Sequence, residues 1–151
     1  MDIREQLRRD HQKALAELDG IARESDAHRS QVRLARLRRA WMIHALAEES
    51  IVYRSVESAA PADRADERFV EHELVEGLFE KISRARHGTH EWHARMNVVR
   101  DLIARHIQSE EGALFADLDE RLSAEELVEM GQRFVLARDK LTLLENSKKA
   151  A

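Results

Sequence analysis

The sequence predicts an all-α protein: an up-down-up-down antiparallel four-helix bundle with an additional C-terminal helix. The chain of 151 residues contains one proline and five glycines, a composition that favours helix over sheet. Apolar residues recur at alternating spacings of three and four, which is typical of bundle helices. Short loops between the predicted helices favour antiparallel neighbours. We expect one domain over 1–151, with the bundle over about 2–122 and the extra helix over about 123–145.

Boundary signals place the first three helices. The first helix is expected over about 2–23. Ser30 is the expected N-cap of the second helix. Pro61 ends that helix, and Asp63 is the candidate cap of a third helix that runs to about residue 86.

The last two helices have equally local signals. Residues 87–89 read His-Gly-Thr and predict a turn, after which a fourth helix runs as far as Ala113. Ser123 and Glu126 have the spacing of a capping box and open the fifth helix. We expect the tail, 146–151, to be frayed.

Histidines and glutamates interrupt the apolar stripes of all four bundle helices. These seven residues are His11, His44, Glu48, His72, Glu76, His106 and Glu110. Residues four apart share a helix face, so each His-x3-Glu pair turns toward the bundle axis. A buried carboxylate is costly unless its charge is compensated, and the stripes contain no lysine or arginine. Histidines and carboxylates on facing helices are how bundles hold di-iron or di-manganese pairs, so the pattern predicts a metal site.

The pattern is also an internal repeat. Residues 44–53 read HALAEESIVY and residues 106–115 read HIQSEEGALF. A single histidine precedes each segment on the previous helix, which predicts a duplicated hairpin around a metal pair with near two-fold symmetry. Glu49 and Glu111 lie five residues after their histidines, about 140° around the helix, and are expected on the flank.

The ninth position of each repeat is aromatic. Regular helix geometry places Tyr53 and Phe115 about 180° from their histidines, so packing is the expected role of both. A bend after Ile51 would instead bring the phenol of Tyr53 to the metals, as a ligand or a redox-active neighbour. Tyr53, the single tyrosine of the chain, is therefore the candidate catalytic residue. An apolar wall around the metals is expected from Trp41, Phe69, Phe79 and Ile103.

The segments that carry these residues resemble the hemerythrin-like, or HHE cation-binding, family of non-haem di-iron proteins. They read RRDHQKAL, HALAEESIVY, VEHELVEGLF and HIQSEEGALF, and the resemblance covers about residues 5–120. It implies two iron ions joined by an oxo or hydroxo group, with zinc or manganese as substitutes. It also implies that Glu48 and Glu110 bridge the ions. The terminal ligands that it implies are His11, His44, His72 and His106.

Two departures from the oxygen-carrying hemerythrins bear on function. Those proteins have His-x3-His on the third helix, where this chain has His72 followed by Glu76. They have His-x4-Asp on the fourth, where this chain has His106-x3-Glu110, with Glu111 as the longer alternative. A ligating Glu76 would stabilise ferric iron and lower the reduction potential. This disfavours reversible oxygen carriage and favours redox reactions with peroxide, nitric oxide or oxygen.

Three classes of function remain open from the sequence. The favoured one is a peroxidase- or catalase-like di-iron protein that detoxifies small oxidants. The second is an oxygen or iron binding, sensing or storage protein without turnover. The third is a structural bundle with adventitious zinc.

Composition sets expectations for partners and location. The net charge of −4, with both signs interspersed, gives no reason to expect a nucleic-acid partner. Without cysteine, the chain has no disulfide, thiolate zinc site or iron–sulfur cluster. No signal-peptide core and no run of ~18 apolar residues is present, so we expect no membrane partner and a cytoplasmic location. The expected partners are small diatomic or peroxide ligands and a redox partner.

Overall fold

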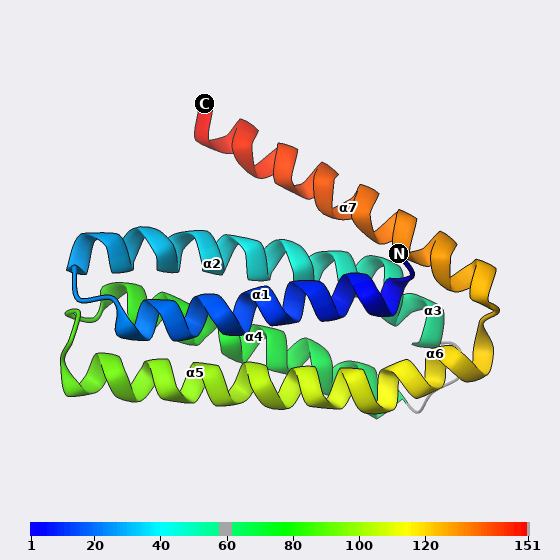
Figure 1. Ribbon diagram of the computed structural model, residues 1–151, viewed down its shortest axis with the longest axis horizontal. Helices are drawn as coiled ribbons and strands as arrows, with labels where there is room; N and C mark the ends of the chain where they lie inside the picture. Colours follow the sequence, from blue (N-terminus) through cyan, green and yellow to red (C-terminus); the bar gives the residue numbers. More distant parts are fainter. Residues whose placement is uncertain (58–61, 151) are drawn as a thin grey trace.

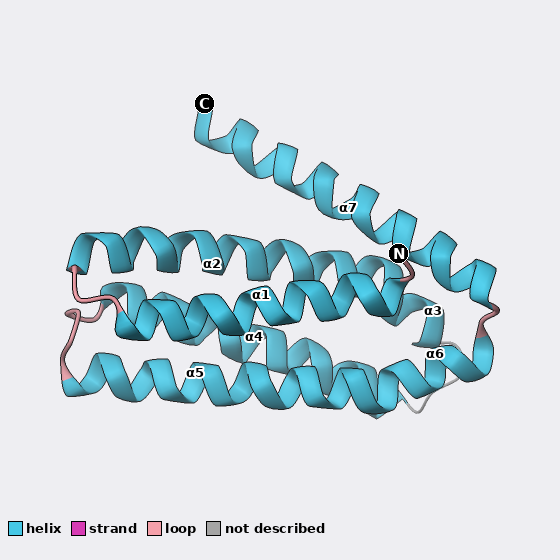
Figure 2. Ribbon diagram, in the orientation of Figure 1, coloured by secondary structure: helices cyan, strands magenta, loops and turns pink. Residues whose placement is uncertain are grey.

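The computed structural model describes residues 1–57 and 62–150, and every regular element within these ranges is helical (Figures 1 and 2). The helices are α1 (Ile3–Arg23), α2 (Ala27–Ala47), α3 (Arg54–Glu57), α4 (Ala62–Arg84), α5 (His90–Ser109), α6 (Phe115–Arg121) and α7 (Ala124–Ala150). Two π-helical segments, η1 (Glu48–Tyr53) and η2 (Glu110–Leu114), continue α2 and α5. Within the described ranges, no helix has the length and apolar character that a membrane crossing requires.

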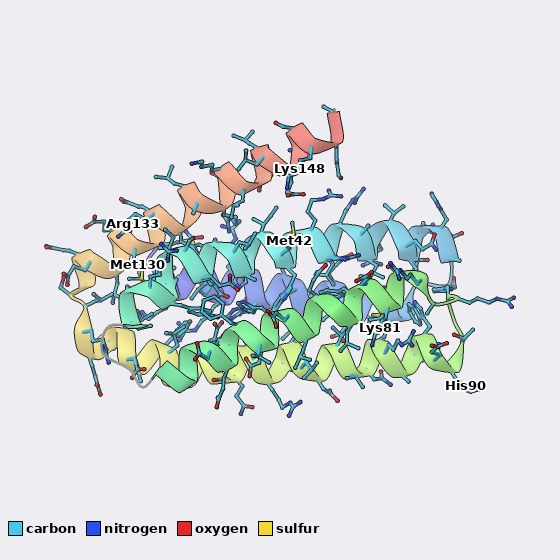
Figure 3. All side chains as sticks on the ribbon, turned by 180° about the vertical axis from the view of Figure 1, so that it is seen from behind. Met42, Lys81, His90, Met130, Arg133 and Lys148 are labelled. Carbon is cyan, nitrogen blue, oxygen red and sulfur yellow. The ribbon has the colours of Figure 1, made fainter. Side chains whose placement is uncertain are left out.

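The predicted bundle with an extra C-terminal helix is confirmed. Four long helices form it, and α1 contacts α2, α2 contacts α4, α4 contacts α5, and α5 contacts α1 (Figure 1). Helix α7 packs on the outside, against α1 and α2, and diverges from α2 toward its C-terminal end. In Figure 3, Met130 lies where α7 meets the bundle, and Lys148 lies near the far, diverging end.

Side-chain caps fix where the first helices begin. Asp2 forms a capping box with Glu5 at the start of α1, in agreement with the predicted start of this helix at about residue 2. The prediction for α2 is wrong: Asp26 accepts the backbone N–H of Arg29, so the helix begins before Ser30, which is buried inside it. Thr89 caps α5 by accepting the N–H of Trp92.

The later boundaries agree less evenly with the sequence. Pro61 and the side chain of Asp63 lie outside the described residues, and α4 ends at Arg84. Gly88 adopts a φ of 77° in the predicted turn, a conformation that favours glycine. The capping box of Ser123 and Glu126 is confirmed.

The tail does not fray after residue 145. Helix α7 continues to Ala150. The hydroxyl of Ser147 donates to the carbonyl of Leu143, and Lys148 pairs with Glu145 at 2.9 Å. These local bonds extend the helix without tertiary packing.

A polar layer divides the apolar core into two clusters. One cluster surrounds Trp41 and Phe79 toward the α1–α2 loop. The other contains Leu7 and Phe134 and lies under α7. Along α1, His11 falls between Leu7 of the second cluster and Ala14 of the first. The histidines of the other three helices also lie between the two clusters, and the order is reversed in α2 and α5 because these helices are antiparallel to α1.

Candidate metal centre

Four histidines and two glutamates converge in the polar layer, and each is at most 5% exposed. They are His11, His44, Glu48, His72, His106 and Glu110. Two groups of candidate ligand atoms form there, and within each group all the atoms lie within 4.8 Å of one another. One group comes from His11, His44, Glu48 and Glu110, and the other from Glu48, His72 and His106. Glu48 belongs to both groups, which is the position that a bridging carboxylate requires.

The Nε2 atoms of the histidines face the two glutamates. His44 Nε2 lies 3.0 Å from Glu48 Oε1, and His72 Nε2 lies 3.4 Å from Glu48 Oε2. His11 Nε2 lies 3.2 Å from Glu110 Oε2, and His106 Nε2 lies 3.4 Å from the same oxygen. Each of the two glutamates therefore lies next to one histidine from each half of the repeat.

The donor atoms fit a bound metal ion. Among the described residues, four buried atoms of this cluster have no hydrogen-bond partner: His11 Nε2, His44 Nε2, Glu48 Oε1 and Glu110 Oε2. Buried polar atoms are ordinarily satisfied, so their convergence on one place calls for a bound group. Imidazole nitrogen and carboxylate oxygen together suit iron, manganese and zinc.

The Nδ1 atom of each of the four clustered histidines meets a carboxylate from the preceding helix around the bundle, α5 with η2 being the one that precedes α1. We call Asp10, Glu49, Glu71 and Glu111 the carboxylate ring. The Nδ1 distances are 3.3 Å for His44 to Asp10, 2.9 Å for His72 to Glu49, 2.6 Å for His106 to Glu71 and 2.9 Å for His11 to Glu111. An Nδ1–H that donates outward leaves the Nε2 lone pair free to face a metal, so the ring sets the orientation of all four imidazoles.

Two members of the carboxylate ring, Asp10 and Glu71, were not predicted from the sequence, although their position next to a histidine was a usable signal. Glu49 and Glu111 lie on the flank, as the spacing predicted, and there they meet histidines of neighbouring helices. Asp10 and Glu71 immediately precede His11 and His72. Adjacent residues diverge by about 100°, so a residue next to an inward histidine faces the neighbouring helix.

The π-helical segments decide where the repeated motifs point. Each begins at the first glutamate of its Glu-Glu pair, and its wider turn shifts the residues that follow. Tyr53 is therefore buried inside the bundle rather than turned away: its hydroxyl donates to Glu110 and lies 3.4 Å from both Glu48 Oε2 and His72 Nε2. Phe115 follows η2 at the matching position and packs in the second apolar cluster.

The structure does not bring Glu76 to the cluster. Its Oε1 accepts hydrogen bonds from Arg38, at 2.8 Å from Nε and 2.5 Å from Nη2. The side chain is 40% exposed. Arg38 compensates the charge that the sequence left unpaired, so this carboxylate needs no metal.

Aromatic rings enclose the cluster. The Trp41 ring lies 5.8, 6.0 and 5.7 Å, between centroids, from His44, His72 and His106. Phe69 packs on Tyr53 at 5.8 Å. Phe79 and Ile103, the other expected wall residues, belong to the apolar cluster of Trp41. Phe134 of α7, which the sequence did not place here, packs on His44 at 5.8 Å.

Charges inside the cluster shift its pKa values in the metal-free chain. Burial disfavours a charged imidazole, but Glu110 and Glu48 outweigh it and raise the pKa of His11 to about 10. Burial is likewise outweighed at His44, whose pKa Glu48 and Asp10 raise to about 9, and at His106, whose pKa Glu110 and Glu71 raise to about 10. Burial and the charge of Glu48 oppose ionisation of Glu110, yet the histidines lower its pKa to about 2. Without metal, imidazolium ions therefore balance the buried carboxylates.

The family model for the hemerythrin HHE cation-binding domain matches residues 2–118, which include the whole cluster. This chain belongs to the hemerythrin HHE family. A protein named DNA nickase, from Nostoc sp. (strain PCC 7120 / SAG 25.82 / UTEX 2576), is 26% identical over 141 residues. The match covers 93% of this chain but 40% of that protein. No solved structure matched. Membership of the hemerythrin HHE family and the buried cluster together indicate a metal-ion site.

Proposed function

We propose that this hemerythrin HHE protein binds two iron ions and reacts with a small oxidant, either hydrogen peroxide in a peroxidase- or catalase-like reaction, or nitric oxide or oxygen in a detoxifying role. One observation carries the proposal: the hydroxyl of Tyr53 faces an enclosed cluster of histidine and glutamate. A proton donor therefore lies within hydrogen-bonding reach of this buried cluster.

Each half of the cluster would hold one ion. His11 and His44 serve one position, His72 and His106 serve the other, and Glu48 faces both. Bound iron would supply electrons and polarise the O–O bond of peroxide. The carboxylate ring keeps the imidazoles oriented, so the protein does not need to reorganise when a ligand arrives.

Tyr53 is the residue of this chain best placed to move a proton. Burial, followed by the negative charges of Glu48 and Glu110, raises the pKa of Tyr53 well above its usual value, so the phenol retains its proton. Two-electron cleavage of the O–O bond of peroxide yields strongly basic oxygen anions, which can take a proton even from a phenol whose pKa is raised. The Tyr53 hydroxyl can supply one, and Glu110 holds that hydroxyl in place.

The apolar wall limits what reaches the cluster. Trp41 covers three of the histidines, and Phe134 covers His44 from α7. All six clustered residues are nearly inaccessible to solvent. A molecule of the size of peroxide or nitric oxide is therefore a better substrate than an organic one.

The test combines metal analysis with turnover by matched variants. We expect two iron ions per chain and peroxide consumption by the iron-loaded protein. Glu48→Gln should lose both, because Glu48 faces both metal positions. Glu76→Gln should retain both, because Glu76 pairs with Arg38 outside the cluster. One zinc ion or no metal would refute the proposal, and iron without turnover would leave oxygen or iron binding, sensing or storage as the function.

A second candidate, scission of one DNA strand, follows from the similarity to the DNA nickase. The net charge of −4 gives little attraction for a phosphate backbone, and a DNA strand cannot reach the buried cluster. Incubation of the iron-loaded protein with supercoiled plasmid tests this function. Nicking that Glu48→Gln abolishes and Glu76→Gln preserves would support it.

A further inference from the structure

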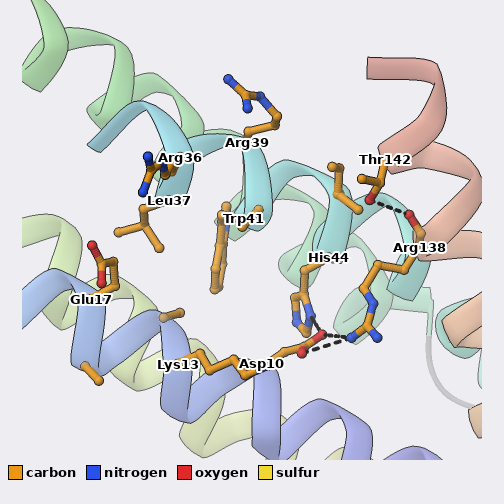
Figure 4. A pocket seen from close by; sticks show the side chains of 14 residues that line it. Asp10, Lys13, Glu17, Arg36, Leu37, Arg39, Trp41, His44, Arg138 and Thr142 are labelled. Carbon is orange, nitrogen blue, oxygen red and sulfur yellow. Dashed lines mark hydrogen bonds and ion pairs between the residues drawn. The ribbon is translucent and has the colours of Figure 1, made fainter. Parts of the chain in front are cut away.

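A cavity of about 760 Å³ lies between α1, α2 and α7, beside the metal centre (Figure 4). Its lining on α2 extends from Arg36 to His44, which is about 12 Å at 1.5 Å per residue. Ala14, Leu37 and Trp41 contribute apolar surface to it. The volume is in the range of small-molecule sites, and the shape suits an elongated ligand.

The lining has an excess of positive charge. Its two carboxylates are both paired: Asp10 with Arg138, at 3.0 and 2.9 Å, and Glu17 with Arg33, at 2.7 Å. Three further cations line the cavity: Lys13, Arg36 and Arg39. No described carboxylate lies within ion-pair distance of these three.

Trp41 connects this cavity with the metal centre. Its side chain extends from α2 toward α1 between Leu37 and His44 (Figure 4). Trp41 is 3% exposed, and its indole Nε1–H has no acceptor among the described residues. The ring also lies against the metal-site histidines His72 and His106. Trp41 thus forms part of the cavity lining and of the wall of the histidine cluster.

We propose that the cavity binds an elongated amphipathic anion, of the class of acyl-chain carboxylates. The ligand's carboxylate pairs with Arg36, where Lys13 and Arg39 add to the positive charge of the lining, and its apolar body covers Ala14, Ala40 and the Trp41 ring. Binding needs no metal and goes beyond the proposed reaction. Ligand binding would nevertheless affect the position of His44 in the metal centre. Arg138 in the cavity wall donates a hydrogen bond to Asp10, and Asp10 in turn contacts His44 Nδ1.

The test titrates metal-loaded and metal-free protein with decanoate, and with decanol as its uncharged counterpart, below their aggregation concentrations in a calorimeter. Ala40→Phe fills the cavity, and Ala35→Phe is its matched control, exposed on the same helix but outside the lining. Arg36→Glu reverses a charge in the cavity lining. Arg105→Glu is its control, because it makes the same charge reversal on the exposed face of α5, outside the lining. We expect saturable 1:1 binding of decanoate, weakened roughly tenfold or more by Ala40→Phe and by Arg36→Glu, with both controls unchanged.

Several results would overturn the proposal. They are absence of saturable decanoate binding to the wild type, equal affinity for decanol, or full affinity in Arg36→Glu. Sedimentation detects the competing occupant, a second copy of the chain, as a dimer that Ala40→Phe dissociates. Circular dichroism verifies that the variants fold, and if Ala40→Phe does not, the Arg36→Glu and decanol measurements decide.

Discussion

Tyr53 donates a hydrogen bond to Glu110, 57 residues further along the chain, and this bond joins the two halves of the repeated hairpin. The same hydroxyl lies 3.4 Å from Glu48 and 3.4 Å from His72. One phenol thus touches both shared carboxylates and one of the metal-site imidazoles.

Replacement of Tyr53 by phenylalanine should lower peroxide consumption by roughly a hundredfold, the scale of a lost proton donor. Iron content should be unchanged, because the donor atoms of the four histidines and two glutamates remain. Initial rates and metal content of the same preparation test this prediction. An unchanged rate would show that the phenol only packs.

Glu71→Gln should weaken metal binding by about 10- to 100-fold, because the carboxylate of Glu71 orients His106. Glu73→Gln, an exposed change on the same helix, should have no effect. Competition with a chelator measures both affinities. If the two variants bind metal equally, the ring carboxylates have no role in holding the metal.

Metal binding at pH 7 should release protons. The pKa values of His11, His44 and His106 are about 10, 9 and 10 in the metal-free chain, so these imidazoles are protonated, and a metal requires them neutral. The number of protons released should fall as pH rises through 9 to 10. Calorimetry in two buffers with different ionisation enthalpies counts these protons. Binding heats that are the same in both buffers would show that no protons are released and would contradict the protonation of these histidines in the metal-free chain.

The same shifts predict how the free energy of unfolding of the metal-free protein varies with pH. A histidine whose pKa rises from 6.5 to about 10 contributes stability that is fully present below pH 6.5 and is lost through pH 10. Glu110, lowered from 4.5 to about 2, contributes stability that is present above pH 4.5 and is lost as pH falls toward 2. Chemical denaturation should therefore show a maximum between about pH 4.5 and 6.5, and a flatter profile above pH 6.5 for metal-loaded protein. A metal-free protein that gains stability from pH 7 to 10 would refute this balance.

Gly131→Ala should destabilise the protein by about 1–3 kcal/mol. A Cβ on Gly131 would lie 2.8 Å from the carbonyl oxygen of Met1 and 2.9 Å from the backbone of Asp2 and Ile3, so α7 could no longer pack closely on the start of α1. Gly77→Ala meets nothing within 4 Å and should stabilise α4 by about 1 kcal/mol. Opposite signs in urea denaturation are the expected result. Equal effects would show that the close approach at Gly131 is unimportant.

The bundle, and the convergence of six of the seven candidate residues on its axis, could be predicted because periodicity is local to each helix. His44 and Glu48 share a face whatever the rest of the chain does. Glu76 has the same spacing from His72, but its environment depends on Arg38 of another helix, which no pattern within α4 reveals. Spacing predicts the face of a residue, whereas its partner depends on how the helices pack.

The π-helical segments mark the other limit of the sequence. A regular helix places Tyr53 opposite His44, and only a wider turn brings the phenol inside. The bend after Ile51 considered from the sequence takes this form. Both π-helical segments begin at the Glu-Glu pairs. The sequence repeat therefore identified where the helices change, but it did not specify that the change is a π-helical turn.

The correspondence between Tyr53 and Phe115 has a consequence for ligand binding. Two identical halves would receive an incoming molecule in either of two equivalent orientations. Here the phenol stands beside His72 in one half, and a phenyl ring fills the matching position in the other. The two metal positions that we propose would therefore be inequivalent, and this polarity would favour one end of the pair for ligand binding and one direction for proton delivery.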